Sequence, residues 1–286
     1  MQIGKLAMTL TATVLLSAAC ADDTPAQVAG PGDLGHIHDL VETDDGTLLV
    51  ASHTGLYRID DIATATLVGT EQHDLMSMAA ANDTIYASGH PDLRLEQYRV
   101  EGLPAHLGLA ESDDLGRTWT VDPNLLGRYD FHALQPTELG LYAADSLGTI
   151  RFRDDEGEWS DLGSLEARDL AADPNDPRRL VATDWDGQLW SSDDGAQTWA
   201  LAIGSPGAIE VEWLNSDTLF AAAEDGSIHR ASSPDGPWIG VATAPADVET
   251  LYAVNDRLWI TSHGGSIHIS SDDGETWQPV YIPPTI

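Results

Sequence analysis

Histidines and carboxylates supply most of the chemistry that this 286-residue sequence could perform. Seven of its ten histidines precede residue 133, so the imidazoles are concentrated in the first half of the chain. Neutral imidazoles with carboxylates nearby can bind a divalent transition metal, and imidazole suits zinc or copper. The candidate metal ligands are His36, His38, His53, His90, His132 and, more weakly indicated, His263.

Two of these histidines, His36 and His38, stand two residues apart. Side chains at this spacing on a strand point to the same face, so both imidazoles could reach one ion. Met76 and Met78 favour copper slightly over zinc, because a thioether is a soft ligand. Each histidine taken alone reads as an ordinary polar residue at a loop. The metal hypothesis therefore depends on a fold that brings the set together.

Carboxylates suggest a different chemistry, glycoside hydrolysis, which needs two carboxyl groups at a defined separation. The candidate catalytic residues are Glu210, Glu249, Asp145 and Asp184. The chain has 47 acidic residues, so carboxylate pairs are common in it and this indication is weak. No nucleophile motif, nucleotide fingerprint or phosphate-binding loop accompanies them. The sequence does not decide between an enzyme and a binding protein.

A repeat of about 40 residues must position these side chains. Tryptophans at positions 119, 159, 199, 238 and 277 are separated by 40, 40, 39 and 39 residues, and glycines at 148, 187, 226 and 265 keep a spacing of 39. Each unit contains four short alternating segments divided by turns, which is the size of one blade of a β-propeller. We expect an all-β fold of six four-stranded blades over residues 36–286, with blade 1 at 36–70 and an insertion at Pro91–Ala105. A seventh blade is the alternative, if the residues before 36 and Val280–Ile286 form one.

The third turn of the unit carries the most specific motif, S-x-D-x-G-x-T-W. Asp and Ser side chains can accept hydrogen bonds from the turn backbone, Gly accepts positive φ, and Trp can pack between blades. The copies are Ser112, Asp114, Gly116 and Trp119; Ser191, Asp193, Gly195 and Trp199, with one extra residue; and Ser270, Asp272, Gly274 and Trp277. This motif resembles the Asp-box of bacterial sialidases, sortilin-type receptors and photosystem II assembly factors. The resemblance implies a structural turn far from any active face.

Propeller topology predicts where the histidines lie. The first strand of each blade lines the central channel, and its start lies on the same face as the turn between the second and third strands. His36, His38 and His132 fall at first-strand starts, and His53, His90 and His263 fall in those turns, together with Asp145 and Asp184. We therefore expect a His-lined channel mouth opposite the Asp-box turns.

A closer resemblance covers about residues 36–160. The segments that begin at His36, Ala51, Ser88 and Asp130 resemble a group of exported bacterial proteins usually labelled sialidase-like glycosyl hydrolases. That label implies a hydrolase but places no catalytic residue here. A sialidase needs three arginines that bind a carboxylate, and only Arg168 falls at a first-strand position.

The N-terminal residues read as an export signal. Lys5 and the apolar run Leu6–Leu16 are followed by small residues and Cys20, the single cysteine. This arrangement resembles the bacterial lipoprotein box, so we expect a signal peptide at 1–19, lipidation of Cys20 and a flexible tether at 20–35. The protein would then be held at the extracytoplasmic face of a bacterial membrane.

The charge balance limits the partners. With 47 acidic and 13 basic residues the net charge is −34, which repels nucleic acid and excludes DNA or RNA. We expect a monomeric, membrane-anchored binding module with a copper, zinc or small-ligand site at the His-lined mouth. The alternatives are a glycoside hydrolase acting on a glycan, and an envelope scaffold or assembly factor for a protein partner.

Overall fold

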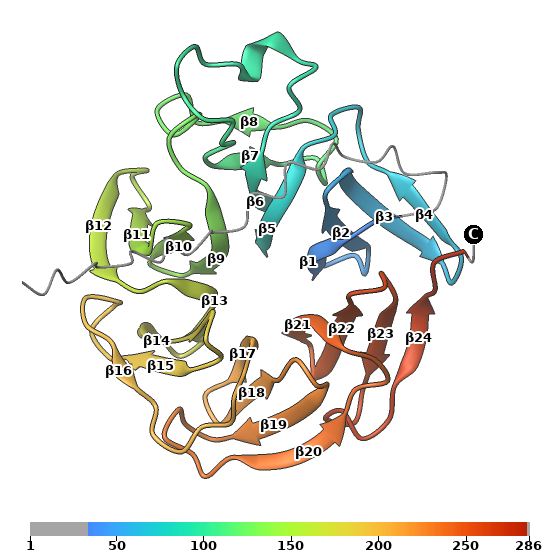
Figure 1. The fold of residues 1–286 in the computed structure, drawn as a ribbon, viewed down its shortest axis with the longest axis vertical. Helices are drawn as coiled ribbons and strands as arrows, with labels where there is room; N and C mark the ends of the chain where they lie inside the picture. The colour runs from blue at the N-terminus through green and yellow to red at the C-terminus, as the bar shows by residue number, and fades with distance from the viewer. Residues whose placement is uncertain (1–33, 285–286) are drawn as a thin grey trace, which may run out of the picture.

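Six four-stranded antiparallel sheets are arranged in a ring in the computed structural model, which describes residues 34–284 (Figure 1). The expected all-β, six-bladed propeller is therefore confirmed, and the seven-bladed alternative is wrong, because the C-terminal residues up to Tyr281 complete blade 6. Within this range no helix is long and apolar enough to cross a membrane. Cys20 and the proposed signal and tether, up to residue 33, lie outside the described residues.

Each blade is one continuous stretch of sequence. Blades 1 and 2 contain β1 (Ile37–Glu42), β2 (Leu48–Ser52), β3 (Gly55–Asp61), β4 (Thr64–Leu67), β5 (Asp74–Ala81), β6 (Thr84–His90), β7 (Ala110–Ser112) and β8 (Thr120–Val121). Blades 3 and 4 contain β9 (Phe131–Thr137), β10 (Gly140–Asp145), β11 (Thr149–Asp154), β12 (Trp159–Ser164), β13 (Ala167–Asp173), β14 (Asp176–Asp184), β15 (Leu189–Ser192) and β16 (Ala200–Leu201). Blades 5 and 6 contain β17 (Glu210–Asn215), β18 (Thr218–Ala222), β19 (Ser227–Ala231), β20 (Ile239–Thr243), β21 (Val248–Val254), β22 (Arg257–Ser262), β23 (Ile267–Ser270) and β24 (Gln278–Tyr281).

The ring closes between blades 6 and 1 through side chains. A buried cluster includes Ile37 and Leu40 of β1 with Trp259 and Tyr281 of blade 6. Glu42 at the end of β1 ties the same junction, because it pairs with Arg257 at 2.7 Å and accepts a hydrogen bond from Trp259 Nε1 at 3.2 Å. Apolar packing thus joins the first and last blades without exchange of a strand.

A β-bulge recurs near the start of the innermost strand in five of the six blades. In β1, Ile37 pairs with Ser52 and Asp39 pairs with Ala51, which leaves His38 without a partner. The same register shift leaves one extra residue in each of β5, β9, β13 and β21: Met76, His132, Arg168 and Glu249. A bulge bends its strand and re-aims the extra side chain. The bulges therefore place five chemically active side chains at equivalent points around one end of the channel.

The expected insertion in blade 2 connects β6 to β7 and contains the short 3-10 helix η1 (Glu96–Tyr98). Asp92 and Glu71 hold it at its base. Asp92 pairs with Arg94 at 2.6 Å, while Glu71 accepts hydrogen bonds from Tyr98 at 2.8 Å and from His73 at 2.9 Å. His73 is buried and also accepts the Asp92 N–H, so it belongs to this support rather than to the channel mouth.

The Asp-box turns have the structure that their residue types predict. In blade 2, Ser112 Oγ accepts the Gly116 N–H at 2.8 Å, and Asp114 accepts the N–H and hydroxyl of Thr118 at 2.9 and 2.7 Å. Ser270 and Asp272 make the equivalent bonds in blade 6. Trp119, Trp199 and Trp277 each pack against residues of the preceding blade.

The box of blade 4 lies one residue later than its sequence match indicated. Ser192 and Asp194, rather than Ser191 and Asp193, make the turn bonds to Ala196 and Thr198. The motif therefore needs no extra residue, because Ala196, and not Gly195, occupies the glycine position of the box with φ 62°. Asp193 points outward, with 86% of its side chain exposed.

This register predicts different effects for two adjacent aspartates. The Asp194→Ala variant should lower the thermal unfolding midpoint at pH 7, because four donors lose their carboxylate acceptor. The matched Asp193→Ala variant should leave the midpoint within experimental error. Calorimetry of both variants checks the assignment, and the opposite ranking would contradict it.

Candidate functional site

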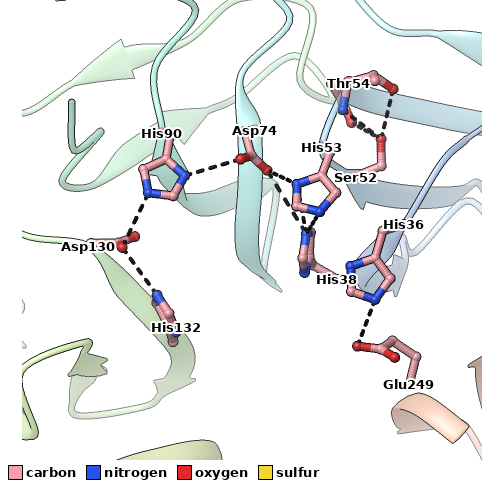
Figure 2. Close-up of polar contacts among 11 residues, drawn as sticks. His36, His38, Ser52, His53, Thr54, Asp74, His90, Asp130, His132 and Glu249 are labelled. Atoms are coloured by element: carbon pink, nitrogen blue, oxygen red, sulfur yellow. Dashed lines mark hydrogen bonds and ion pairs between the residues drawn. The ribbon is translucent and has the colours of Figure 1, made fainter. Parts of the chain in front are cut away.

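The channel mouth holds a connected group of imidazoles and carboxylates from blades 6, 1, 2 and 3, which we call the mouth cluster (Figure 2). Its members are His36, His38, His53, Asp74, His90, Asp130, His132, Glu249 and His263. All six histidines expected at the mouth are present in it. Because the box turns join third to fourth strands, they lie at the opposite end of the blades.

Three imidazoles of blade 1 form the centre of the mouth cluster. His38 Nε2 lies 3.3 Å from both ring nitrogens of His53, and the His36 ring centroid lies 4.5 Å from that of His38. On the other side, His36 Nε2 is 3.0 Å from Glu249 Oε1, and His263 Nδ1 is 3.4 Å from Glu249 Oε2. Glu249 therefore connects blade 6 to the imidazoles of blade 1.

Two aspartates extend the cluster across blades 2 and 3. Asp74 is 2.8 Å from His53 Nδ1 and 3.1 Å from His90 Nδ1. Asp130 is 3.5 Å from His90 Nε2 and 3.2 Å from His132 Nε2. Imidazole and carboxylate thus alternate from His53 to His132. Asp74 and Asp130 were not among the predicted site residues, although both stand directly before a first-strand apolar residue, the place that His36 has in blade 1.

The surroundings give these groups different proton affinities. Burial, together with His53 and His36, lowers the pKa of His38 to about 3, so this imidazole is neutral. Hydrogen bonds with Asp130 and Asp74 raise the pKa of His90 to about 10. Burial pushes the pKa of Asp74 upward, but the hydrogen bonds from His53 and His90 outweigh it and bring the value to about 2.

Two sets of three residues in the cluster have the donor types and proximity of a metal site. The first is His36, His38 and His53, and the second is His36, Glu249 and His263; in each set the potential ligand atoms lie within 4.8 Å of one another. His90 and His132 belong to neither set, and both lie beside Asp130. Met76 occupies the bulge position of blade 2, whereas Met78 is buried in the hydrophobic core.

Below the mouth, a cavity of about 300 Å³ extends into the channel. Four carboxyl groups that were not recognised as a group in the sequence line it: Asp39, Asp169, Glu210 and Glu212. Three of them bind the next blade through backbone N–H groups. Asp39 accepts the Met78 N–H at 2.8 Å, Asp169 accepts that of Val211 at 2.7 Å, and Glu210 accepts that of Leu251 at 3.4 Å.

Burial raises the pKa of each of these channel carboxyls, to about 7 for Asp39 and about 6 for Asp169. The pKa of Glu210 lies well above its ordinary value for the same reason, and the nearby Asp169 adds to the shift. Glu249 differs. Burial opposes its ionisation, but His36, His263 and Arg168 together outweigh this effect and lower its pKa.

Two catalytic candidates hold turns instead of facing the channel. Asp145 accepts the N–H groups of Leu147 and Thr149, and Asp184 accepts those of Asp186 and Gln188. They occupy the register positions of Ser52 and Ser262, which hold the equivalent turns of blades 1 and 6. The residue that faces the mouth is the next one in the sequence, which is His53 in blade 1 and His263 in blade 6. In blade 4 this residue is Trp185. Trp185 is 59% exposed and was not predicted.

Comparison with known proteins identifies the architecture only. The sequence matches no family model and no curated protein. Among solved structures, YCF48 bound to D1 peptide is similar over 90% of this chain and 86% of that chain, with a TM-score of 0.55 and 15% identity. A GH74 enzyme of Niastella koreensis is similar over 85% of this chain and 37% of that chain, with the same TM-score and identity. At this identity the likeness shows the β-propeller fold alone.

The proton affinities at the mouth can be measured one histidine at a time. In NMR titrations of the imidazole resonances, His90 should stay protonated through pH 8, and His38 should stay neutral down to pH 5. Because the pKa of folded His90 lies above 6.5, its contribution to stability is complete below pH 6.5 and is lost as the pH rises through about 10. The Asp74→Asn variant should lower the pKa of His90. Titration of both histidines near 6.5 would contradict the described pairing.

Proposed function

We propose that the protein binds a divalent transition metal at the channel mouth through His36, His38 and His53. The observation that carries this proposal is the convergence of three imidazoles from the start of β1 and the turn after β2. Two ring nitrogens on one tetrahedral zinc ion lie about 3.3 Å apart, because each Zn–N bond is about 2.0–2.1 Å long. The 3.3 Å separation of His38 from His53 matches that geometry.

Protonation supports the same assignment. A histidine must be neutral to bind a metal, and the low pKa of His38 keeps its ring neutral throughout the physiological range. His53 has a raised pKa because Asp74 hydrogen-bonds it, so metal binding there would displace a proton. We therefore expect metal affinity to rise as the pH increases through and above 6.5, the ordinary pKa of histidine.

Carboxylates next to the imidazoles would act as orienting groups. Metal-binding histidines commonly donate their second ring nitrogen to a carboxylate, which fixes the ring and its tautomer. Asp74 lies 2.8 Å from His53 Nδ1, which leaves Nε2 of that ring for the metal. Glu249, 3.0 Å from His36, would either orient His36 or serve as a fourth ligand. Three nitrogen donors and one oxygen donor suit zinc or copper(II).

Isothermal titration calorimetry with zinc and with copper(II) tests the metal proposal. We expect one ion per chain, with affinity reduced by about a hundredfold or more in His38→Ala and in His53→Ala, since even orienting residues contribute about 10–100-fold. Asp74→Asn should weaken metal binding by about 10–100-fold, the effect expected for an orienting residue. His132→Ala should have little effect, because His132 lies outside both ligand sets.

His229→Ala is the matched control, because this histidine lies in β19, away from the mouth. Its metal affinity should equal that of the unmodified protein. Equal metal affinity in the His38→Ala variant would sink the proposal, as would the absence of measurable binding.

A second candidate function, glycoside hydrolysis, is favoured by one observation. Glu210 and Glu249, two of the residues selected from the sequence, have pKa values displaced in opposite directions. A carboxyl with a raised pKa and one with a lowered pKa form the acid–base arrangement that hydrolases use. Arg168 lies near both, 3.5 Å from Glu210 Oε1 through its Nε.

A panel of chromogenic glycosides tests the hydrolase candidate. If the protein is a hydrolase, Glu210→Gln and Glu249→Gln should each lower kcat by about a hundredfold or more, the usual effect of losing a general acid or base. The exposed Glu158→Gln variant should retain full activity. No turnover of any glycoside, or turnover that survives both Glu210→Gln and Glu249→Gln, would exclude this reaction at this site.

A further inference from the structure

We infer that the blade-4 edge of the mouth, formed by Arg168 and Trp185, binds a carboxylate carried on a ring, such as a sugar acid or an aromatic acid. This inference rests on the proposed binding role of the mouth, but it does not require the metal. Neither residue belongs to either metal-ligand set.

Arg168 supplies the charge that a carboxylate would recognise. It is the single arginine or lysine among the residues that line the channel cavity, where His38 and His132 lie as well. Its bulge position directs its side chain toward the mouth. Guanidinium groups bind carboxylates through two parallel N–H donors.

Part of the Arg168 guanidinium can still donate hydrogen bonds to a ligand. Its contact with Glu210 is made by Nε at 3.5 Å, which is long for an ion pair, and this is its one ion pair with a described residue. Burial raises the pKa of Glu210, which weakens its ion pair with the arginine. The free end of the guanidinium fork thus remains available for an acidic ligand.

Trp185 supplies a flat surface beside that charge. The guanidinium carbon of Arg168 lies 5.5 Å from the centre of the indole ring. The His132 ring packs edge-on against the same indole, with 6.1 Å between the ring centroids. The indole is 59% exposed, although large aromatic residues tend to be buried. An exposed indole next to a cation offers stacking to a ring while the arginine takes its acidic group.

The surroundings favour a single negative charge on the ligand. Asp39, Asp169, Glu210 and Glu212 line the cavity below Arg168. Burial and the neighbouring Asp169 already raise the pKa of Glu210, so this environment disfavours negative charge. A doubly charged phosphate would meet more of this cost than a carboxylate would. A cavity of about 300 Å³ also accommodates a group the size of one ring.

Matched pairs of ligands test this inference on metal-free protein. Calorimetric or NMR titrations would compare glucuronate with glucose and benzoate with benzyl alcohol. At least one carboxylate should bind about tenfold or more tightly than its neutral partner, since a hydrogen-bonded charge pair contributes about that factor. Binding of glucuronate alone identifies a sugar acid, and binding of benzoate alone identifies an aromatic acid.

Substitutions then assign the effect to the two residues. Arg168→Gln should remove the preference for the acid over its neutral partner. Trp185→Ala, a change at an exposed position, should weaken binding of the acid about tenfold. Arg128→Gln, at an exposed arginine away from the cavity, should change neither value. Circular dichroism of Arg168→Gln monitors folding, and zinc titration of the same variant tests the metal proposal separately. Equal binding of acid and neutral ligands, no binding of either, or an unchanged preference in Arg168→Gln would overturn the inference.

Discussion

The bulge near the start of the innermost strands is the constraint on which the mouth depends. In a regular antiparallel ladder, successive side chains alternate between the two faces of the blade, and neither face is the end of the channel. The unpaired residue in β1, β5, β9, β13 and β21 breaks that alternation once. His38, His132, Arg168 and Glu249 owe their shared position to this one irregularity. The residue type at the bulge position then decides which chemical group that blade contributes to the mouth.

The same strands hold the ring together with groups that would otherwise be costly to bury. Asp39 and Asp169 follow the bulge positions of β1 and β13, and Glu210 is the first residue of β17. All three accept backbone N–H groups from the neighbouring blade. A buried carboxyl normally loses its charge, and the raised pKa values of these groups reflect that cost. The lower part of the channel therefore disfavours negative charge, whereas contacts with histidines lower the pKa of Asp74 and Glu249 at the mouth.

The sequence predicts the repeat and its phase, because Trp and Gly spacings report periodic packing directly. It therefore predicts six blades and the face on which His36, His53 and His90 meet. It does not predict the bulges, since a bulge depends on pairing with a second strand and has no residue signature of its own. Asp145 and Asp184, expected at the mouth, lie one residue before it, and Trp185 was missed, because strand pairing decides which residue of the turn faces the mouth. The box of blade 4 was misaligned because its glycine position holds Ala196. The partners Asp74 and Asp130 are visible only once neighbouring blades are side by side.

X-ray absorption spectroscopy of the zinc-loaded protein tests the central claim, a metal held by blade-1 imidazoles, most directly. The account predicts a four-coordinate first shell of nitrogen and oxygen at about 2.0–2.1 Å, with the outer-shell scattering of at least two imidazole rings. That scattering should decrease in the His38→Ala variant. A shell made of oxygen ligands alone would contradict the claim and place the ion among carboxylates. Imidazole scattering that is unchanged by His38→Ala would also contradict it, because other histidines would then hold the ion.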